Sequence, residues 1–177
     1  DIDGFHNNDP RYVEGTSPIS ELSFEEAGEL AYFGAKILHP QTVFPAQKRA
    51  IPVFLKNTLD PQAQGTRISN DATANGVKAI AAKDGITAIK IRSERMFQSH
   101  GFLSKIFEVF SRHETSIDMI TTSEVAVSLT IDDSKNLDKI VEELQRIARV
   151  EVDENQSIVC LVGHEITKSN DTYKLFG

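Results

Sequence analysis

The stretch that decides the fold is Met96 to Thr130, which reads MFQSHGFLSKIFEVFSRHETSIDMITTSEVAVSLT. Apolar residues recur in its first half at the helical period, which predicts an amphipathic helix over 101–113. Its second half is rich in β-branched residues and predicts strands over 116–121 and 125–131. The apolar face of the predicted helix comprises Phe102, Leu103, Ile106, Phe107, Val109 and Phe110.

Segments on both sides of this stretch extend the pattern. Upstream, residues 77–81 and 86–91 read as two strands. Downstream, a second amphipathic helix begins at Leu137, and strands are predicted over 150–152 and 158–162. The order β-α-β-β-α-β is that of a ferredoxin-like fold, in which two helices cover one face of a four-stranded antiparallel sheet. Many ligand-sensing modules share this fold, so the fold alone does not define a function.

The N-terminal part of the chain follows a different pattern. Residues 1–12 are rich in Asp, Asn and Gly, which favours a loop. Ser23 to Glu26 form a capping box that starts a helix, and we expect Gly34 to end that helix in the left-handed conformation. Pro40 suits the first turn of a second short helix that reaches about Lys48.

A strand and a polar segment follow these two helices. Residues 51–55 read as a strand, and Pro52 indicates either an edge strand or a position among the first residues of the strand. Residues 57–75 are mostly polar or small, which predicts a linker with a domain boundary near 69–75.

Composition excludes several classes of protein. The formal net charge of −7 disfavours non-specific binding to nucleic acid or to an anionic membrane, since both need a basic face. The single cysteine, Cys160, cannot form an internal disulfide and reads as a small buried hydrophobe in a reducing, cytoplasmic protein. No apolar run approaches the roughly 18 residues of a membrane span, and no signal peptide is evident. Because the chain lacks an initiator methionine, we expect it to be a fragment of a longer protein.

The start of the helix at 101–113 offers a possible binding site. Gly101 leaves the first N–H groups of the helix open at its positive dipole end, which suits a carboxylate. Asp118 could hold an ammonium group, and Met96 could line an aliphatic stem. The pattern is consistent with a pocket for a free amino acid. The alternative is that Gly101 only permits a turn, Met96 is core and Asp118 is solvated.

Two separated groups of motifs resemble the aspartate kinase family. Residues 1–11 (DIDGFHNNDPR) and 33–40 (FGAKILHP) look like the nucleotide-binding end of its catalytic domain, an amino-acid-kinase fold. Residues 96–130, with ITTSEV at 120–125, resemble its first ACT regulatory module, and 163–177 the start of a second. Among the members of this family, the chain resembles the lysine-sensitive, monofunctional type more than the threonine-sensitive type fused to homoserine dehydrogenase.

The resemblance implies an α+β chain with a ferredoxin-like βαββαβ ACT module preceded by a partial α/β amino-acid-kinase fold. The implied domains are 1–70 for the C-terminal part of the kinase domain, 71–162 for the ACT domain and 163–177 for a truncated second ACT domain. The implied parent enzyme transfers a phosphoryl group from Mg-ATP to the side-chain carboxylate of L-aspartate, in the first step of lysine, threonine and methionine biosynthesis. The glycine-rich lysine motif and the aspartate-binding residues of the family are missing from this sequence, so we expect the isolated fragment to be inactive.

The resemblance also implies which residues would contact the nucleotide. Arg11 and Lys36 correspond to phosphate contacts, and Asp1 and His6 would lie near the ribose and adenine. Phe5 and His6 depart from the family pattern, in which an aliphatic residue is followed by tyrosine. A solvated Lys36 and a surface ion pair of Arg11 are the alternatives. The residues imply no metal site and no tightly bound cofactor.

The resemblance further implies an allosteric lysine site and a homodimer formed through the ACT domains. Three alternatives stay open: a threonine-sensitive aspartate kinase, a stand-alone amino-acid-binding regulatory subunit, and a purely structural dimerisation module. No nucleic acid or membrane partner is expected. The lysine-binding residues would be Met96, Ser99, Gly101, Phe102, Leu103, Ser116, Ile117, Asp118, Ser123 and Glu124.

Overall fold

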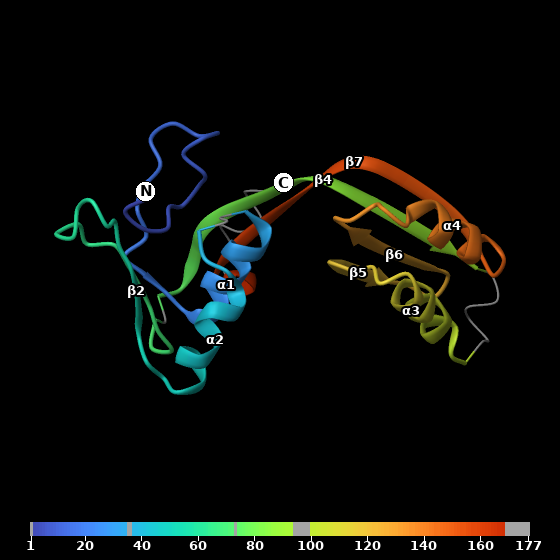
Figure 1. The fold of residues 1–177 in the computed structure, drawn as a ribbon, viewed down its shortest axis with the longest axis horizontal. Coiled ribbons are helices and arrows are strands. Elements are labelled where there is room, and N and C mark those ends of the chain that lie inside the picture. Colours follow the sequence, from blue (N-terminus) through green and yellow to red (C-terminus); the bar gives the residue numbers. More distant parts are fainter. Residues whose placement is uncertain (1, 35–36, 73, 94–99, 169–177) are drawn as a thin grey trace. The chain divides into compact units, whose positions relative to one another are not determined.

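A computed structural model describes residues 2–34, 37–72, 74–93 and 100–168. The chain divides into two compact units, unit 1 (Asp1–Lys83 with Val159–Gly177) and unit 2 (Asp84–Ile158). A three-stranded sheet has the order β1-β3-β2, and a four-stranded sheet has the order β5-β6-β4-β7 (Figure 1). The domain boundaries implied by the family resemblance stay predictions.

Unit 1 contains a small sheet with a central strand that the sequence did not indicate. β3 pairs with β1 in parallel and with β2 antiparallel. Thr66 of β3 is fully buried: its hydroxyl accepts a hydrogen bond from the Phe5 amide (2.8 Å) and donates one to the Ile19 carbonyl (2.7 Å). The prediction of a linker is therefore wrong for these residues. The elements are β1 (Glu21–Leu22), α1 (Phe24–Phe33), α2 (Pro40–Lys48), β2 (Val53–Leu55) and β3 (Thr66–Ile68).

The predicted capping box starts α1. The Ser23 hydroxyl accepts from the Glu26 amide at 3.0 Å, and the Glu26 carboxylate accepts from the Ser23 amide at 2.7 Å. The prediction of a left-handed Gly34 is wrong, because its φ of −167° is extended backbone. A side chain at Gly34 would lie 3.3 Å from the side chain of Ala81, so this glycine permits close packing on β4.

The second helix and the edge strand of unit 1 agree with the sequence. α2 begins at Pro40, as predicted, and the His39 side chain caps it by accepting a hydrogen bond from the Gln41 amide (3.2 Å). β2 is an edge strand, and Pro52 directly precedes it. Proline is tolerated at this position because it has no backbone N–H to donate to a neighbouring strand, and an edge strand needs fewer such donors.

Two long strands replace four predicted short ones. β4 (Gly76–Arg92) and β7 (Arg149–His164) both continue where the sequence predicted a break. Each strand has a residue with positive φ in its interior, Gly85 at 75° in β4 and Asn155 at 56° in β7, and Gly76 at the start of β4 has a φ of 101°. The Ser157 hydroxyl of β7 lies 2.5 Å from the Asp84 carboxylate of β4. Residues that resemble turn residues therefore lie inside paired strands, and each strand contributes residues to both units.

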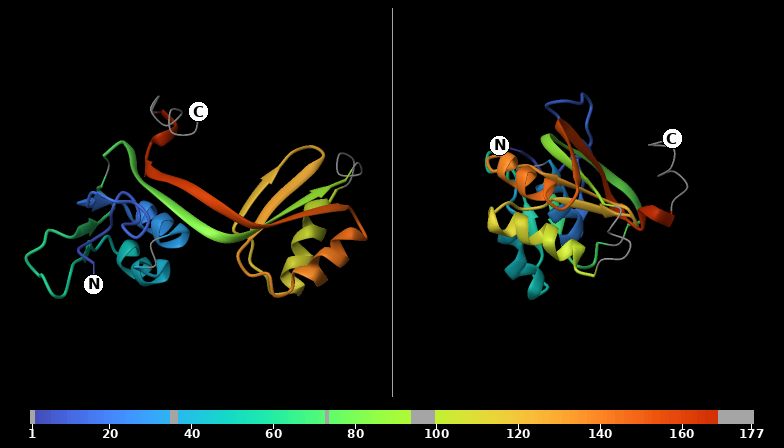
Figure 2. Two further views of the ribbon diagram at one scale, coloured as in Figure 1. Left: turned by 90° about the horizontal axis from the view of Figure 1, so that it is seen from above. Right: turned by 90° about the vertical axis from the view of Figure 1, so that its right-hand side faces the viewer.

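Unit 2 has the predicted order of elements, β4-α3-β5-β6-α4-β7. α3 (Phe102–Arg112) and α4 (Leu137–Gln145) cover one face of the sheet (Figure 2). β6 (Ala126–Ile131) pairs antiparallel with both β4 and β5 (Met119–Thr122). β5 begins three residues later than predicted, although the Asp118 amide already bonds to the Thr130 carbonyl at 2.9 Å.

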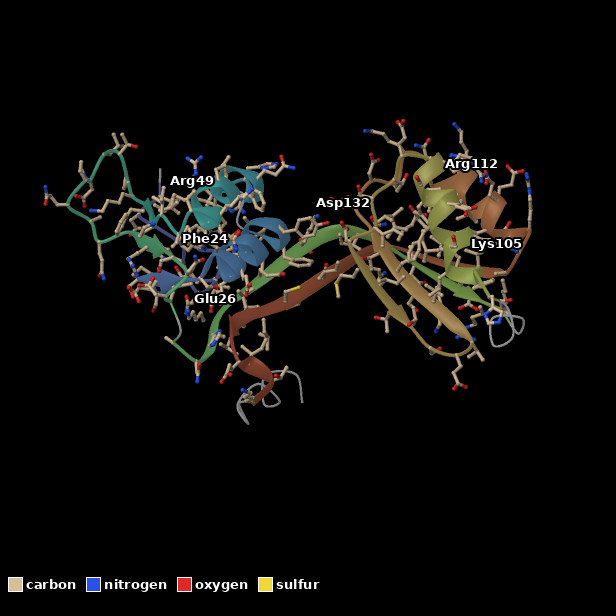
Figure 3. All side chains as sticks on the ribbon, turned by 90° about the horizontal axis from the view of Figure 1, so that it is seen from below. Phe24, Glu26, Arg49, Lys105, Arg112 and Asp132 are labelled. Atoms are coloured by element: carbon tan, nitrogen blue, oxygen red, sulfur yellow. The ribbon has the colours of Figure 1, made fainter. Side chains whose placement is uncertain are left out.

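The core of unit 2 lies between the two helices and the sheet, where apolar side chains fill the space (Figure 3). Leu103 and Phe107 do not join it, since they are 36% and 42% exposed. The apolar face of α3 is thus narrower than predicted. The buried residues of this core are Ile89, Ile91, Phe102, Ile106, Val109, Phe110, Val127, Leu129, Ile131, Leu137, Ile140 and Leu144. A short 3-10 helix (Ile166–Lys168) follows β7.

Candidate functional site

Hydrogen bonds hold the predicted nucleotide residue His6 in the N-terminal loop. Its Nε2 lies 3.0 Å from the Asp3 carboxylate, and its Nδ1 lies 2.9 Å from the Thr16 hydroxyl. The hydrogen bond from His6 lowers the pKa of Asp3. In this geometry both ring nitrogens are engaged, so only the faces of the imidazole are available for stacking on a base.

Arg11 forms a surface ion pair with a neighbour in sequence. Its Nε lies 3.0 Å from Asp9 Oδ1, and its guanidinium lies 5.8 Å from the centre of the Tyr12 ring. The hydrogen bond from Arg11 lowers the pKa of Asp9. The Arg11 side chain is 71% exposed, so it can turn from Asp9 to a phosphate at little energetic cost. The other two predicted nucleotide residues, Asp1 and Lys36, lie outside the described residues.

A small hollow of about 100 Å³ lies beside this loop. Asp3 lines it and also contacts His6, but neither His6 nor Arg11 lines it. Gly65 at its rim has a φ of 69°, and a side chain there would lie 2.3 Å from the Leu55 carbonyl oxygen. Only Asp3 of its lining residues lies in a motif that the sequence singles out. Ala63, Gln64 and Gly65 come from the stretch interpreted as a linker, and Pro18 and Ser20 lie outside every predicted element. The hollow is lined by Asp3, Pro18, Ser20, Ala63, Gln64 and Gly65.

The start of α3 has the open geometry that the sequence predicted. Gly101 is its N-cap residue and is left-handed, with φ 78° and ψ 13°, and among the described residues no side chain caps this end. The first N–H groups of a helix have no partner inside the helix. They are therefore suited to an anion. Phe102 is buried in the core, whereas Leu103 is partly exposed; Met96 and Ser99 lie outside the described residues.

The second group of predicted effector residues precedes β5. Ile117 packs against the core, and Ser116 is exposed. The backbone of Asp118 is fixed to β6, and one of its carboxylate oxygens is buried. This carboxylate is therefore held in place by the sheet and is less free than one on a loop.

The third group lies in the turn between β5 and β6. The Ser123 amide donates to the Ala126 carbonyl at 2.8 Å, and the Ser123 hydroxyl lies 3.2 Å from the Ala126 amide. Glu124 is exposed at this turn. The hydrogen bond from the Ser93 amide to the Val125 carbonyl (3.2 Å) places the turn at the end of β4 from which the chain runs to α3.

Those predicted effector residues that the structure describes do not converge within one chain. α3 lies between Gly101 and Ser116, and its 11 residues rise about 16 Å. The N–H groups at 101–103 and the turn at 123–124 therefore share one end of unit 2, and Asp118 lies at the other. A free amino acid is too short to reach both ends of the same copy.

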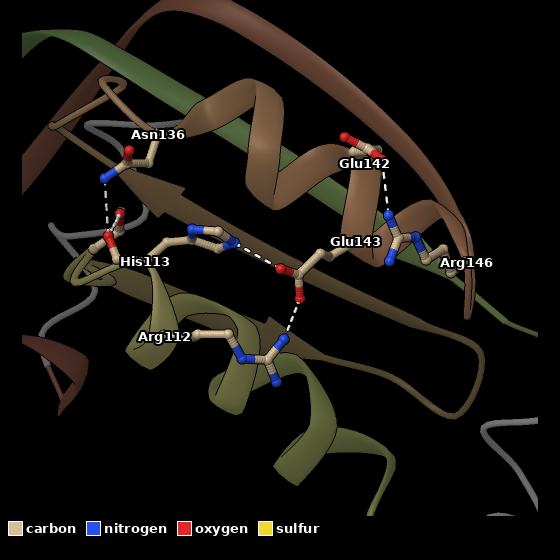
Figure 4. Close-up of polar contacts among 7 residues, drawn as sticks. Arg112, His113, Asn136, Glu142, Glu143 and Arg146 are labelled. Atoms are coloured by element: carbon tan, nitrogen blue, oxygen red, sulfur yellow. Dashed lines mark hydrogen bonds and ion pairs between the residues drawn. The ribbon is translucent and has the colours of Figure 1, made fainter.

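Unit 2 also contains a polar network that the sequence analysis missed. The Glu143 carboxylate of α4 accepts from Arg112 and lies 2.9 Å from His113 Nε2 (Figure 4). The side-chain amide of Asn136 donates a hydrogen bond to the His113 carbonyl at 2.9 Å. These contacts join the end of α3 to α4, and we interpret them as structural. Their residues lie 23 to 31 positions apart, so no local motif signals them.

Neither a metal site nor a membrane-spanning helix is found in the described part of the chain. There, no group of three or more His, Cys, Asp or Glu side chains could hold a metal ion. Likewise, no described helix is long and apolar enough to cross a membrane. Cys160 is half-buried, and burial, with Glu29 nearby, raises the pKa of its thiol.

Comparison with known families matches both regions. Residues 1–57 match the amino acid kinase family, and residues 89–145 match the ACT domain. Lysine-sensitive aspartokinase 3 of Escherichia coli (strain K12) is 39% identical over 96% of this chain. Aspartokinase 3, chloroplastic, of Arabidopsis thaliana is 42% identical over 93% of it. The chain covers 40% and 31% of the lengths of these two relatives.

Solved structures agree with this match. The crystal structure of E. coli aspartokinase III in complex with lysine and aspartate superposes with a TM-score of 0.86 at 37% identity, covering 99% of this chain and 42% of that one. The complex of the same enzyme with aspartate and ADP gives 0.86 at 38% identity, covering 98% and 41%. Sequence and fold agree over both regions, and the chain therefore matches a section of the aspartokinases that contains part of the amino-acid-kinase fold and an ACT domain.

Proposed function

We propose that the protein to which this chain belongs is a lysine-inhibited aspartate kinase, which forms 4-phospho-L-aspartate from ATP and L-aspartate. The observation that carries the proposal is the match to the E. coli lysine-sensitive enzyme, which includes the kinase and ACT regions and is 39% identical over 178 residues. A structure of that enzyme contains lysine and aspartate. The cytoplasmic location stays a prediction, since some relatives are named chloroplastic.

In this proposal, the N-terminal loop and Lys36 contact the nucleotide. Phosphoryl transfer depends on positioning and on cations that stabilise the charge of the phosphates, which Mg²⁺, Arg11 and Lys36 would supply. Asp1 and His6 would lie at the nucleoside. The high exposure of Arg11 supports this role, because its guanidinium is free to exchange Asp9 for a phosphate. The other catalytic residues are expected in the remainder of the protein, so the chain by itself is expected to be inactive.

The lysine pocket would be formed by two copies of the chain. Gly101 and Asp118 are separated by the length of α3, so one copy cannot offer both ends to one lysine. A two-fold axis places the same surface of each copy against the other and can bring the Gly101 end of one copy to the Asp118 end of its partner. β5 supports such an interface, since it is an edge strand whose four residues are all exposed. Lysine would then inhibit by favouring one arrangement of the two copies.

The test uses the full-length protein. ATP-dependent phosphorylation of aspartate is measured with and without lysine, threonine or methionine, and calorimetry measures the binding of each. We expect turnover that lysine suppresses. Suppression by threonine alone would favour the threonine-sensitive type. Binding of lysine without turnover would favour a regulatory subunit, and the absence of heat with any of the three would leave a structural module.

A further inference from the structure

We propose that a buried ion pair, Lys78 with Glu26, positions the N-terminal loop, which contains the proposed nucleotide contacts His6 and Arg11. The pair holds β4 against α1, so that the Ile80 amide reaches the carbonyl of Asn7, the neighbour of His6. Lys78 and Glu26 are therefore positioning residues that act through Asn7 and do not touch the nucleotide. This inference depends on the proposed kinase function.

The pair is nearly removed from solvent. Lys78 Nζ lies 2.7 Å from Glu26 Oε2, and the two side chains are 11% and 5% exposed. Glu26 lies on α1 (Figure 3) and also closes the capping box with Ser23. Its second carboxylate oxygen is buried and has no hydrogen-bond partner among the described residues. Lys78 is thus the cation that compensates this carboxylate.

A buried ion pair of this kind gives little net stability, because desolvating both charges offsets their attraction. It does penalise misalignment strongly, because a buried charge that loses its partner is unfavourable. The apolar contacts beside the pair restrict the position of β4 less, since Gly34 packs on the small side chain of Ala81. The pair therefore fixes where β4 lies on α1 more sharply than packing does. The two buried charges therefore serve to position β4 and add little to the stability of the fold.

The position of β4 determines the contact with the loop. Two residues after Lys78, the Ile80 amide donates to the Asn7 carbonyl at 2.9 Å. Asn7 in turn fixes the loop internally: its amide donates to the Ser17 carbonyl at 3.0 Å, and its side chain accepts from the Ser17 amide at 2.8 Å. A displacement of β4 would move Asn7 and, with it, the adjacent His6.

The test is steady-state kinetics of the full-length enzyme. A Lys78→Met variant would leave the Glu26 charge buried alone and could fail to fold, so the main variant is the double substitution Glu26→Gln with Lys78→Met, which leaves no buried charge. We expect its KM for ATP to rise about tenfold, since small displacements of positioning groups have effects of this size or larger, with kcat and the KM for aspartate nearly unchanged. We also expect faster hydrogen exchange at the Ile80 amide.

The control is Arg67→Met, which removes two ion pairs with the exposed carboxylates of Glu21 and Asp71 in the same unit and should leave all kinetic constants unchanged. A folded double variant with an unaltered KM for ATP would overturn the proposal. So would an equal loss of kcat and kcat/KM with no change in the KM for ATP, which would indicate a general structural role. A wild-type enzyme that neither binds nor uses ATP would overturn the proposed function itself, and the positioning role with it.

Discussion

Replacing Gly101 with alanine tests the unusual N-cap of α3. Gly101 is left-handed at φ 78°, whereas most N-cap residues are extended. A methyl group built there meets nothing within 4 Å among the described residues, so the change introduces no clash with them. The only remaining cost is that of the backbone conformation, because a left-handed alanine is less stable than a left-handed glycine by about 1 to 2 kcal/mol. We therefore expect Gly101→Ala to destabilise α3 by about that amount.

Gly28 provides a control with the opposite expected sign. It lies inside α1 and has no positive φ, and within the described part of the chain its added methyl group also meets nothing within 4 Å. Alanine is favoured over glycine in a helix by about 0.5 to 1 kcal/mol, so Gly28→Ala should stabilise α1. The same chemical change thus has opposite effects at two uncrowded positions.

Native-state hydrogen exchange of the full-length protein is the appropriate assay, because the two glycines lie in different units and a single unfolding transition need not report on both. Amides of α3 should exchange about fivefold or more faster in Gly101→Ala, as expected for 1 kcal/mol or more. Amides of α1 should exchange more slowly in Gly28→Ala. Unchanged or slower exchange of α3 in Gly101→Ala would refute the left-handed cap.

Three further predictions concern single residues. Asp118→Ala should weaken lysine binding roughly 10- to 150-fold, since a hydrogen bond to a charged group contributes about 1.5 to 3 kcal/mol; equal affinity by calorimetry would show that Asp118 is not the ammonium partner. Gly65→Ala should destabilise unit 1 by about 2 kcal/mol or more, because φ is 69° and the new side chain would meet the Leu55 carbonyl at 2.3 Å; an unchanged melting midpoint would contradict this. The Ser69 side chain nearby and the hydrogen bonds from Arg67 lower the pKa of Asp71 to about 2, so its stabilising contribution should be present above its ordinary value of 3.8 and disappear as the pH falls through about 2. An NMR titration should find that midpoint, and Ser69→Ala should raise it toward 3.8.

Local signals predicted the helices well. The capping box of α1 and the apolar period of α3 depend on residues a few positions apart, which the sequence displays directly. β3 was missed because its polar Thr66 is buried by partners 61 and 47 residues away. β4 and β7 were each divided in two because Gly85 and Asn155 resemble turn residues, although the neighbouring strands hold them in the sheet.

The candidate site shows the same limit. The sequence indicated the kinds of group that a free amino acid would need, an open helix start and a carboxylate. It could not show that α3 separates Gly101 from Asp118, because that follows from the path of the backbone. Nor could it join Glu26 to Lys78, which lie 52 residues apart on different elements.

The long strands also matter for constructing chimeric enzymes. The border between the two units crosses the chain between Lys83 and Asp84 and again between Ile158 and Val159, both times inside a strand. A recombinant that exchanges the regulatory module therefore cannot be joined at a flexible linker. Both crossover points must be made within β4 and β7 and must keep their lengths unchanged, because a one-residue slip would turn every following side chain to the opposite face of the sheet. Libraries that vary only one crossover should therefore yield few folded proteins.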